Sequence, residues 1–258
     1  MKNFLIYIFA VIMVIIAFPI TETFAQEGTG ESDPIGFSLG VDYMSNYLWR
    51  GGYWYSGDGA FFPSLSYEIA GLAISYCGEF SEDAVIDDGD NDIKDLHATD
   101  LGVDYLFSIG DTLTVGAGVW YFYFHNEDTY SFITGTVSVT LDSVPLIPTL
   151  TYNHDYYTDS EDKNDFYIQL GISHDIEIVK GASLEFGLVG AYYNADSTDQ
   201  KGISDIIASI SLSVEADGVT YSSGFNYAAV PSKDFKKDLN GKDDNHRFYG
   251  TFGVSYSI

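Results

Sequence analysis

Residues 35–43 read Ile-Gly-Phe-Ser-Leu-Gly-Val-Asp-Tyr, with an apolar side chain at every odd position and a small or polar one at every even position. Alternation with a period of two is typical of a β-strand whose two faces meet different surroundings. The same pattern continues through most of the sequence that follows. It predicts twelve strands, at about residues 35–50, 61–70, 72–80, 96–109, 112–124, 130–141, 146–157, 166–178, 183–194, 204–216, 219–229 and 247–258.

The expected connections between these strands differ in length along the chain. Those after the even-numbered strands are short, at residues 70–71, 110–111, 142–145, 179–182 and 217–218. Those after the odd-numbered strands are mostly longer and acidic, and the longest span residues 81–95 and 231–246. Short turns at one end, longer loops at the other and an even strand number are typical of outer-membrane barrels. We therefore predict an all-β protein with a single up-and-down antiparallel transmembrane β-barrel of about twelve strands, located in the bacterial outer membrane.

The charged residues of the expected strands all share one face. No Asp, Glu, Lys or Arg falls on the apolar face, whereas the opposite face combines the charges with Gly, Ser, Thr and Asn. A charge that faces lipid at mid-depth costs roughly 2–4 kcal/mol. The apolar face is therefore predicted to meet lipid, and the polar face to line the inside of the barrel.

Aromatic residues of the apolar face gather near the strand ends, where amphipathic rings prefer the level of the lipid headgroups. The expected girdle at the long-loop end consists of Tyr47, Trp49, Phe61, Phe80, Tyr121, Tyr123, Tyr156, Phe166, Tyr192, Tyr227 and Phe248. The expected girdle at the short-turn end consists of Phe37, Tyr67, Tyr105, Phe107, Tyr221 and Tyr256.

The first 25 residues have the layout of a cleavable signal peptide. Lys2 precedes an apolar run from Phe4 to Phe18, and small residues stand at Thr23 and Ala25. The run is shorter than the ~20 residues that a helix needs to cross a bilayer. We predict that residues 1–25 are removed, that residues 26–34 form a short periplasmic segment, and that residues 35–258 form the barrel.

The formal net charge of −27 limits the possible partners. Such acidity argues against nucleic acid, whose phosphates would be repelled. Cys77 is the only cysteine, so an internal disulfide is excluded.

No cofactor or metal is expected, because the acidic run at residues 87–92 lacks the spacing of a calcium-binding EF-hand loop. A solvated loop is the preferred interpretation of that run, and divalent bridging to lipopolysaccharide is the alternative.

Residues 45–51 read Ser-Asn-Tyr-Leu-Trp-Arg-Gly at the top of the first expected strand. This motif resembles the gcw_chp-type family of bacterial outer-membrane β-barrel proteins, through Ser45, Tyr47, Arg50 and Gly51. The resemblance implies an outer-membrane location and no established reaction. The last strand ends on Tyr256, Ser257 and Ile258, and resembles the C-terminal signal that the barrel-insertion machinery reads.

Twelve strands predict a lumen between the filled interior of eight-stranded barrels and the open channel of sixteen-stranded porins. The inward face near the short turns carries Asp42, Glu68, Asp104, Asp175, Glu185 and Glu215, and near the long loops it carries Tyr157, Tyr167, Tyr193 and Tyr249 with Arg50 and Arg247. Carboxylates in a confined lumen favour cations. In the alternative interpretation these groups only solvate or brace the interior, with the arginines facing Glu79, Asp100, Asp155 or Asp205.

We therefore predict a narrow porin-like channel for passive passage of cations or small neutral solutes, with outer-membrane lipid and lipopolysaccharide around it. A closed structural or surface-interaction barrel is the alternative, and an outer-membrane hydrolase is a third possibility. An enzyme is not expected, because the sequence has no phosphate loop, zinc spacing or nucleophile elbow. His154 and Asp155 are neighbours in the sequence, so on a strand they point to opposite faces.

Overall fold

The computed structural model describes residues 36–50, 52–53, 59–81, 85–87, 92–94, 97–125, 131–157, 164–197, 199–233, 235 and 246–258. The expected signal peptide, the segment at 26–34 and Gly51 lie outside the described residues, as do most residues of the acidic run at 87–92. In the parts of the chain that the structure describes, no helix is long and apolar enough to cross a membrane.

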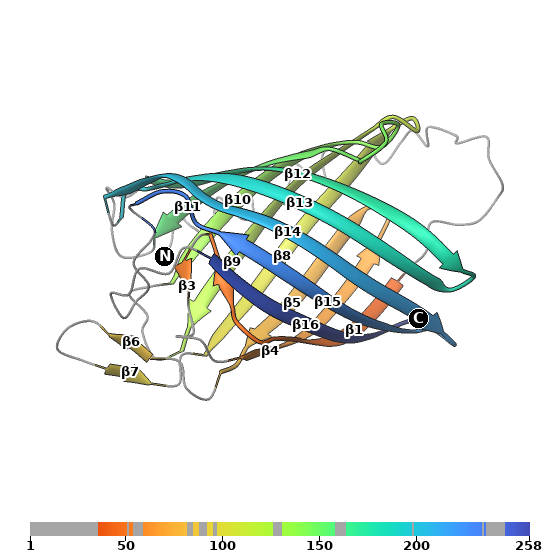
Figure 1. Ribbon diagram of the computed structural model, residues 1–258, viewed down its shortest axis with the longest axis horizontal. Helices are drawn as coiled ribbons and strands as arrows, with labels where there is room; N and C mark the ends of the chain where they lie inside the picture. Colours follow the sequence, from red (N-terminus) through yellow and green to blue (C-terminus); the bar gives the residue numbers. More distant parts are fainter. Residues whose placement is uncertain are drawn as a thin grey trace. The chain divides into compact units, whose positions relative to one another are not determined.

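Twelve antiparallel strands form a closed barrel, as the sequence predicts. They are β1 (Gly36–Met44), β4 (Ala60–Ile69), β5 (Leu72–Glu79), β8 (Ala98–Ile109), β9 (Leu113–Phe124), β10 (Phe132–Leu141), β11 (Thr149–Tyr157), β12 (Asn164–Val179), β13 (Ala182–Ala195), β14 (Gln200–Ala216), β15 (Val219–Ala229) and β16 (His246–Ser257). Each barrel strand pairs with the next one along the chain, and β1 also pairs with β16, which closes the wall. The long strands β12, β13 and β14 lie side by side in this wall (Figure 1).

Two small sheets that the alternation does not predict are separate from the barrel sheet. One joins β2 (Leu48–Trp49) to β3 (Gly52–Tyr53), and the other joins β6 (Val85–Asp87) to β7 (Asp92–Lys94). The second sheet forms within residues 81–95, for which the sequence analysis expects only a loop. Such short strands leave too few alternating positions for the pattern to be recognised.

The turns at the short-turn end follow from local backbone chemistry. Ala70 and Gly71 have φ of 49° and 78°, and Asp217 and Gly218 have φ of 53° and 79°. A two-residue hairpin turn with positive φ at both central residues matches the twist of the flanking strands. The connection before β11 is longer than predicted and runs to residue 148, because Leu146 and Ile147 also adopt positive φ.

The two ends of the barrel chain meet at this same end of the wall. The backbone N–H of Phe37 donates to the carbonyl oxygen of Ile258 (3.2 Å), and the N–H of Ile258 donates to the carbonyl oxygen of Phe37 (2.9 Å). Both termini of the barrel therefore lie on the short-turn side.

The outward face is apolar and exposed along the wall, as the alternation predicts. Leu101, Leu170 and Phe225 are each more than half exposed. Aromatic side chains of both expected girdles are also exposed on this face, including Phe61, Phe80, Tyr156, Tyr192 and Phe248 at one end and Phe37, Tyr67, Tyr105, Phe107, Tyr221 and Tyr256 at the other. A continuous apolar outer surface on a closed barrel suits a lipid bilayer.

The buried residues lie inside the barrel, near the ends of the strands that lead to the long loops. One cluster consists of Ala60, Phe62, Ala98, Phe124 and Phe132. A second consists of Tyr167, Ala191, Tyr193, Ala195, Val230 and Phe235. Toward the short turns the inward residues Glu68, Asp175, Glu185 and Glu215 are exposed. The interior is thus packed near the long loops and polar near the short turns.

Candidate functional site: the lumen and its inward segment

The wall of β1 ends at Met44, and residues 45–50 then turn into the barrel. We call these residues the inward segment. Its first residue is held against β16, because the N–H of Ser45 donates to the carbonyl oxygen of Gly250 and the N–H of Gly250 donates to Ser45 Oγ, both at 2.9 Å. The predicted strand at 35–50 is therefore six residues too long.

The prediction that Tyr47 and Trp49 belong to the lipid-facing girdle is wrong, because both side chains lie inside the lumen. The Tyr47 ring lies 4.9 Å from that of Phe62, and the Trp49 ring lies 5.7 Å from that of Phe132. Tyr47 and Trp49 keep the odd positions of the apolar face, although Ser45 and Leu48 interrupt the alternation where the chain leaves the wall. The same apolar residues pack against inward aromatic side chains instead of against lipid.

Arg50 lies at the end of the inward segment and is only 8% exposed. Its guanidinium forms an ion pair with Asp155 of β11. It also lies over the Trp49 ring, 4.3 Å from the ring centroid, and 5.4 Å from the Tyr167 ring. Asp155 accepts a second hydrogen bond from Thr134 Oγ1 at 2.6 Å. Arg50 therefore forms its ion pair with Asp155, one of the four acids that the sequence offers as partners for the arginines.

Two further aspartates are buried on the same side of the lumen. The Asp165 carboxylate accepts hydrogen bonds from Tyr157 Oη (2.7 Å), Tyr193 Oη (3.1 Å), and the N–H (2.8 Å) and Oγ (2.6 Å) of Ser197. Asp205 accepts from Tyr167 Oη (3.2 Å) and from Ser204 Oγ (2.7 Å). Because both of these carboxylates have donors, the cost of burying them is offset.

A β-bulge makes this network possible. Ala191 pairs with Asp205 and Tyr192 pairs with Ile203, so Ser204 is an extra residue in β14. The bulge leaves both Ser204 and Asp205 buried, although a regular strand would point neighbours to opposite faces. The predicted strand begins at residue 204, and its alternation does not indicate the bulge.

Three of the four tyrosines predicted to line the pore are buried inside the barrel. Tyr157, Tyr167, Tyr193 and Tyr249 are on the inward face, but Tyr167, Tyr193 and Tyr249 are at most 9% exposed. All four pack in the lumen, and Tyr157, Tyr167 and Tyr193 donate hydrogen bonds to Asp165 or Asp205. Arg247 is also on the inward face and is half-buried.

The opposite side of the inward segment faces a pair of acids. Tyr47 Oη donates to Glu79 Oε1 at 3.0 Å. Asp100 on the neighbouring strand β8 interacts with Glu79 and is 4% exposed, and its Oδ1 has no hydrogen-bond partner among the described residues. A gap of about 10 Å³ remains here beside Tyr47, Trp49 and Glu79. That is room for about one water molecule.

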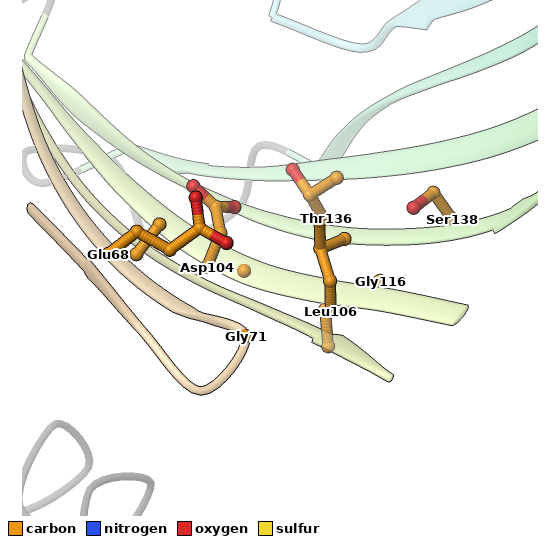
Figure 2. A pocket seen from close by; sticks show the side chains of 10 residues that line it. Glu68, Gly71, Asp104, Leu106, Gly116, Thr136 and Ser138 are labelled. Atoms are coloured by element: carbon orange, nitrogen blue, oxygen red, sulfur yellow. The ribbon is translucent and has the colours of Figure 1, made fainter. Parts of the chain in front are cut away.

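The six predicted acids lie on the inward face toward the short turns, as expected. Glu68 and Asp104 line a cavity of about 300 Å³ in the lumen wall (Figure 2). Asp175 and Glu185 face each other as register partners on β12 and β13. Asp42 and Glu215 lie on β1 and β14.

The cavity wall also contains residues that the sequence analysis did not single out. Gly118, Thr136 and Ser138 line it, and Trp120 Nε1 donates to Asp104 Oδ1 at 3.1 Å. Their importance depends on strand register, which brings together residues from β4 to β10 and is not visible in one strand. Within the described ranges, no three His, Cys, Asp or Glu side chains are grouped so that they could hold a metal ion.

No protein-family model and no curated protein matches the chain. Solved structures do match. The NanC porin has a TM-score of 0.56 at 13% identity, covering 85% of this chain and 100% of the porin. The KdgM porin has a TM-score of 0.55 at 11% identity, with coverage of 86% and 99%. The COG4313 outer membrane channel from Pseudomonas putida F1 has a TM-score of 0.55 at 13% identity, with coverage of 90% and 99%. The chain thus has the fold of outer-membrane β-barrels.

Proposed function

We propose that the protein is a narrow channel of the bacterial outer membrane for passive passage of small solutes, with a preference for cations. The observation that carries this proposal is the inward segment. A stretch of chain between two wall strands folds into the lumen and is held there by the Arg50–Asp155 ion pair. Between this segment and the short turns, the lumen is lined by polar and exposed inward residues. Such a segment narrows a barrel that would otherwise contain water.

The preference for cations rests on the charges of the lumen. The short-turn half carries the six inward acids named above, whereas Arg50 is already paired with Asp155. Confined carboxylates raise the local concentration of cations and repel anions. The two porins and the channel that share the fold support a transport role by analogy of fold only.

The proposal gives a structural role to three residues of the motif at 45–51. Ser45 anchors the inward segment to β16, Tyr47 donates to Glu79, and Arg50 pairs with Asp155. We propose that the gcw_chp-type family, which this motif resembles, shares the inward segment. The outward apolar belt would meet outer-membrane lipid and lipopolysaccharide, and the insertion machinery would read β16.

One observation favours a closed barrel as the second candidate. The lumen beside the inward segment is packed, with Asp155, Asp165 and Val230 at most 1% exposed. A barrel filled in this way would serve as a structural or surface-interaction protein. The two candidates differ in whether ions pass.

Conductance in planar bilayers tests the proposal. The purified protein should give small stepwise currents that favour K⁺ over Cl⁻. Arg50→Ala should enlarge the steps, because the inward segment loses its ion pair, whereas Lys201→Ala removes a positive charge from an exposed position and should leave them unchanged. Silence of both the native protein and the Arg50 variant over many insertions would establish the closed barrel instead.

A further inference from the structure

The cavity of Figure 2 spans two neighbouring rungs of the barrel wall, and both of its carboxylates lie on one of them. Strand register aligns Glu68 with Ala73, Ala73 with Asp104, Asp104 with Gly118, and Gly118 with Thr136. Adjacent strands lie about 4.8 Å apart, so the backbones of Glu68 and Asp104 are roughly 10 Å apart with only a methyl group between them. Two carboxylates thus flank a recess in the wall.

The recess exists because bulky side chains are absent from its floor. A Cβ atom at Gly118 would collide with Asp104 Oδ1, and a Cβ atom at Gly116 would meet Ser138 Oγ and lie 3.0 Å from Leu106 Cδ2. The glycines therefore leave room for the neighbouring side chains and for the open volume between them. A volume of about 300 Å³ lies at the lower end of the range for small-molecule sites.

The polar atoms that line the recess are mainly hydrogen-bond acceptors. Asp104 Oδ1 accepts from Trp120 Nε1, which orients the carboxylate. The Thr136 hydroxyl donates to Asn153 Oδ1 at 2.8 Å, so its oxygen remains only as an acceptor for the cavity. No Lys, Arg or His lines the recess among the described residues, while Leu106 and Ala73 contribute apolar surface. Acceptors and negative charge around an apolar patch suit a cation with donor hydrogens and a short hydrocarbon body.

We infer that this recess binds a small organic cation that carries ammonium groups on a short apolar chain. An ammonium group supplies donors and charge to Glu68 and Asp104, and the chain lies along Ala73 and Leu106. The inference deepens the proposed channel function, because it names a solute class and places its binding site on the lumen wall. Binding from the short-turn side does not require ions to cross the barrel.

Calorimetric titration of the purified barrel in detergent with 1,4-diaminobutane tests the site. Binding should be saturable with one molecule per barrel, and the neutral analogue 1,4-butanediol should not bind. Glu68→Gln and Asp104→Asn should each weaken binding about tenfold, as expected for the loss of one hydrogen bond to a charged group. Ala73→Val should also weaken binding, because it fills the recess without changing the charge.

Glu185→Gln is the matched control, since it removes the same charge from the same end of the lumen but outside the recess. Binding to this variant should stay within about twofold of the native value. Equal weakening by Glu185→Gln and Glu68→Gln, or equal displacement of the diamine by K⁺ at the same ionic strength, would show a diffuse acidic field and overturn the site. A barrel that conducts without binding diamine would contradict only the site, and one that binds diamine but is silent in bilayers would contradict only the channel.

Discussion

Arg50 and Asp155 form a buried ion pair between residues that are 105 positions apart in the sequence. Asp155 is a wall residue of β11, whereas Arg50 belongs to the inward segment. The pair therefore ties the segment to the wall across the lumen. Thr134 completes the hydrogen bonding of Asp155, so the carboxylate is held from two directions.

Breaking this ion pair should destabilise the barrel. Arg50→Ala leaves Asp155 buried without its cation, and the loss of one partner of a buried pair typically costs about 3–5 kcal/mol. The free energy of unfolding should fall by that order in both Arg50→Ala and Asp155→Ala, measured by urea unfolding in lipid vesicles. The double variant should be hardly less stable than either single variant, because the interaction is already lost. Strictly additive losses would mean that the two residues do not stabilise each other.

Asp100→Asn should have the opposite effect and stabilise the barrel by about 1 kcal/mol. Asp100 is buried beside Glu79, and its Oδ1 has no hydrogen-bond partner in the described structure. A neutral amide of the same shape carries no charge beside Glu79 and can still donate a hydrogen bond to it. The urea midpoint should therefore rise.

Asp165→Asn is the matched control for this change, because the Asp165 carboxylate accepts four hydrogen bonds from Tyr157, Tyr193 and Ser197. An amide nitrogen cannot accept them, so this variant should lose stability. An equal fall of the midpoint in both asparagine variants would show that the two carboxylates do not differ in what their hydrogen bonds contribute to stability.

The inward acids should determine ion selectivity. Replacement of Asp42, Asp104, Asp175 and Glu215 together by Asn or Gln removes negative charge with little change in side-chain size. The preference for K⁺ over Cl⁻ should fall in bilayer recordings, and more so at 0.01 M salt, where the Debye length is ~30 Å, than at 0.1 M, where it is ~10 Å. Unchanged selectivity in a folded variant would contradict the role of these acids.

The outward face supplies the control for this set. Leu184, Leu188 and Ile210 lie on it, and Leu188 and Ile210 are more than a third exposed. Their replacement by Asp should abolish assembly, because a charge that faces lipid has neither water nor a partner. Tolerance of these three charges together with misfolding of the inward set would reverse the assignment of faces.

The orientation of the barrel can be checked by labelling of intact cells. Peptide tags inserted within 81–95 or 231–246 should be reached by antibody from outside, because long loops of such barrels are extracellular. A tag at the Asp217–Gly218 turn should be reached only after the outer membrane is permeabilised. The reverse pattern of labelling would place the short turns outside.

The sequence by itself determined the wall of the barrel. Alternation is a local property, because the side chains of a strand point alternately to two faces, and lipid on one face excludes charge from it. The strand number, the outward residues such as Leu101 and Phe225, and the hairpin turn at Asp217–Gly218 could all be predicted in this way. The positions of Glu68 and Asp104 on the inward face follow from the same parity.

Only the tertiary structure decided what fills the lumen. Tyr47 and Trp49 keep the odd positions of the apolar face of β1, yet they lie inside, because Ser45 bonds to Gly250 and Arg50 finds Asp155 on the far wall. Neither partner is near in the sequence, so no local pattern contains this information. The recess beside Asp104 likewise depends on the register of five neighbouring strands, which brings Ala73, Gly118 and Thr136 onto one rung. Local alternation specifies to which face of a strand a side chain points. The strand register, and the turn of the inward segment into the lumen, specify which side chains it contacts.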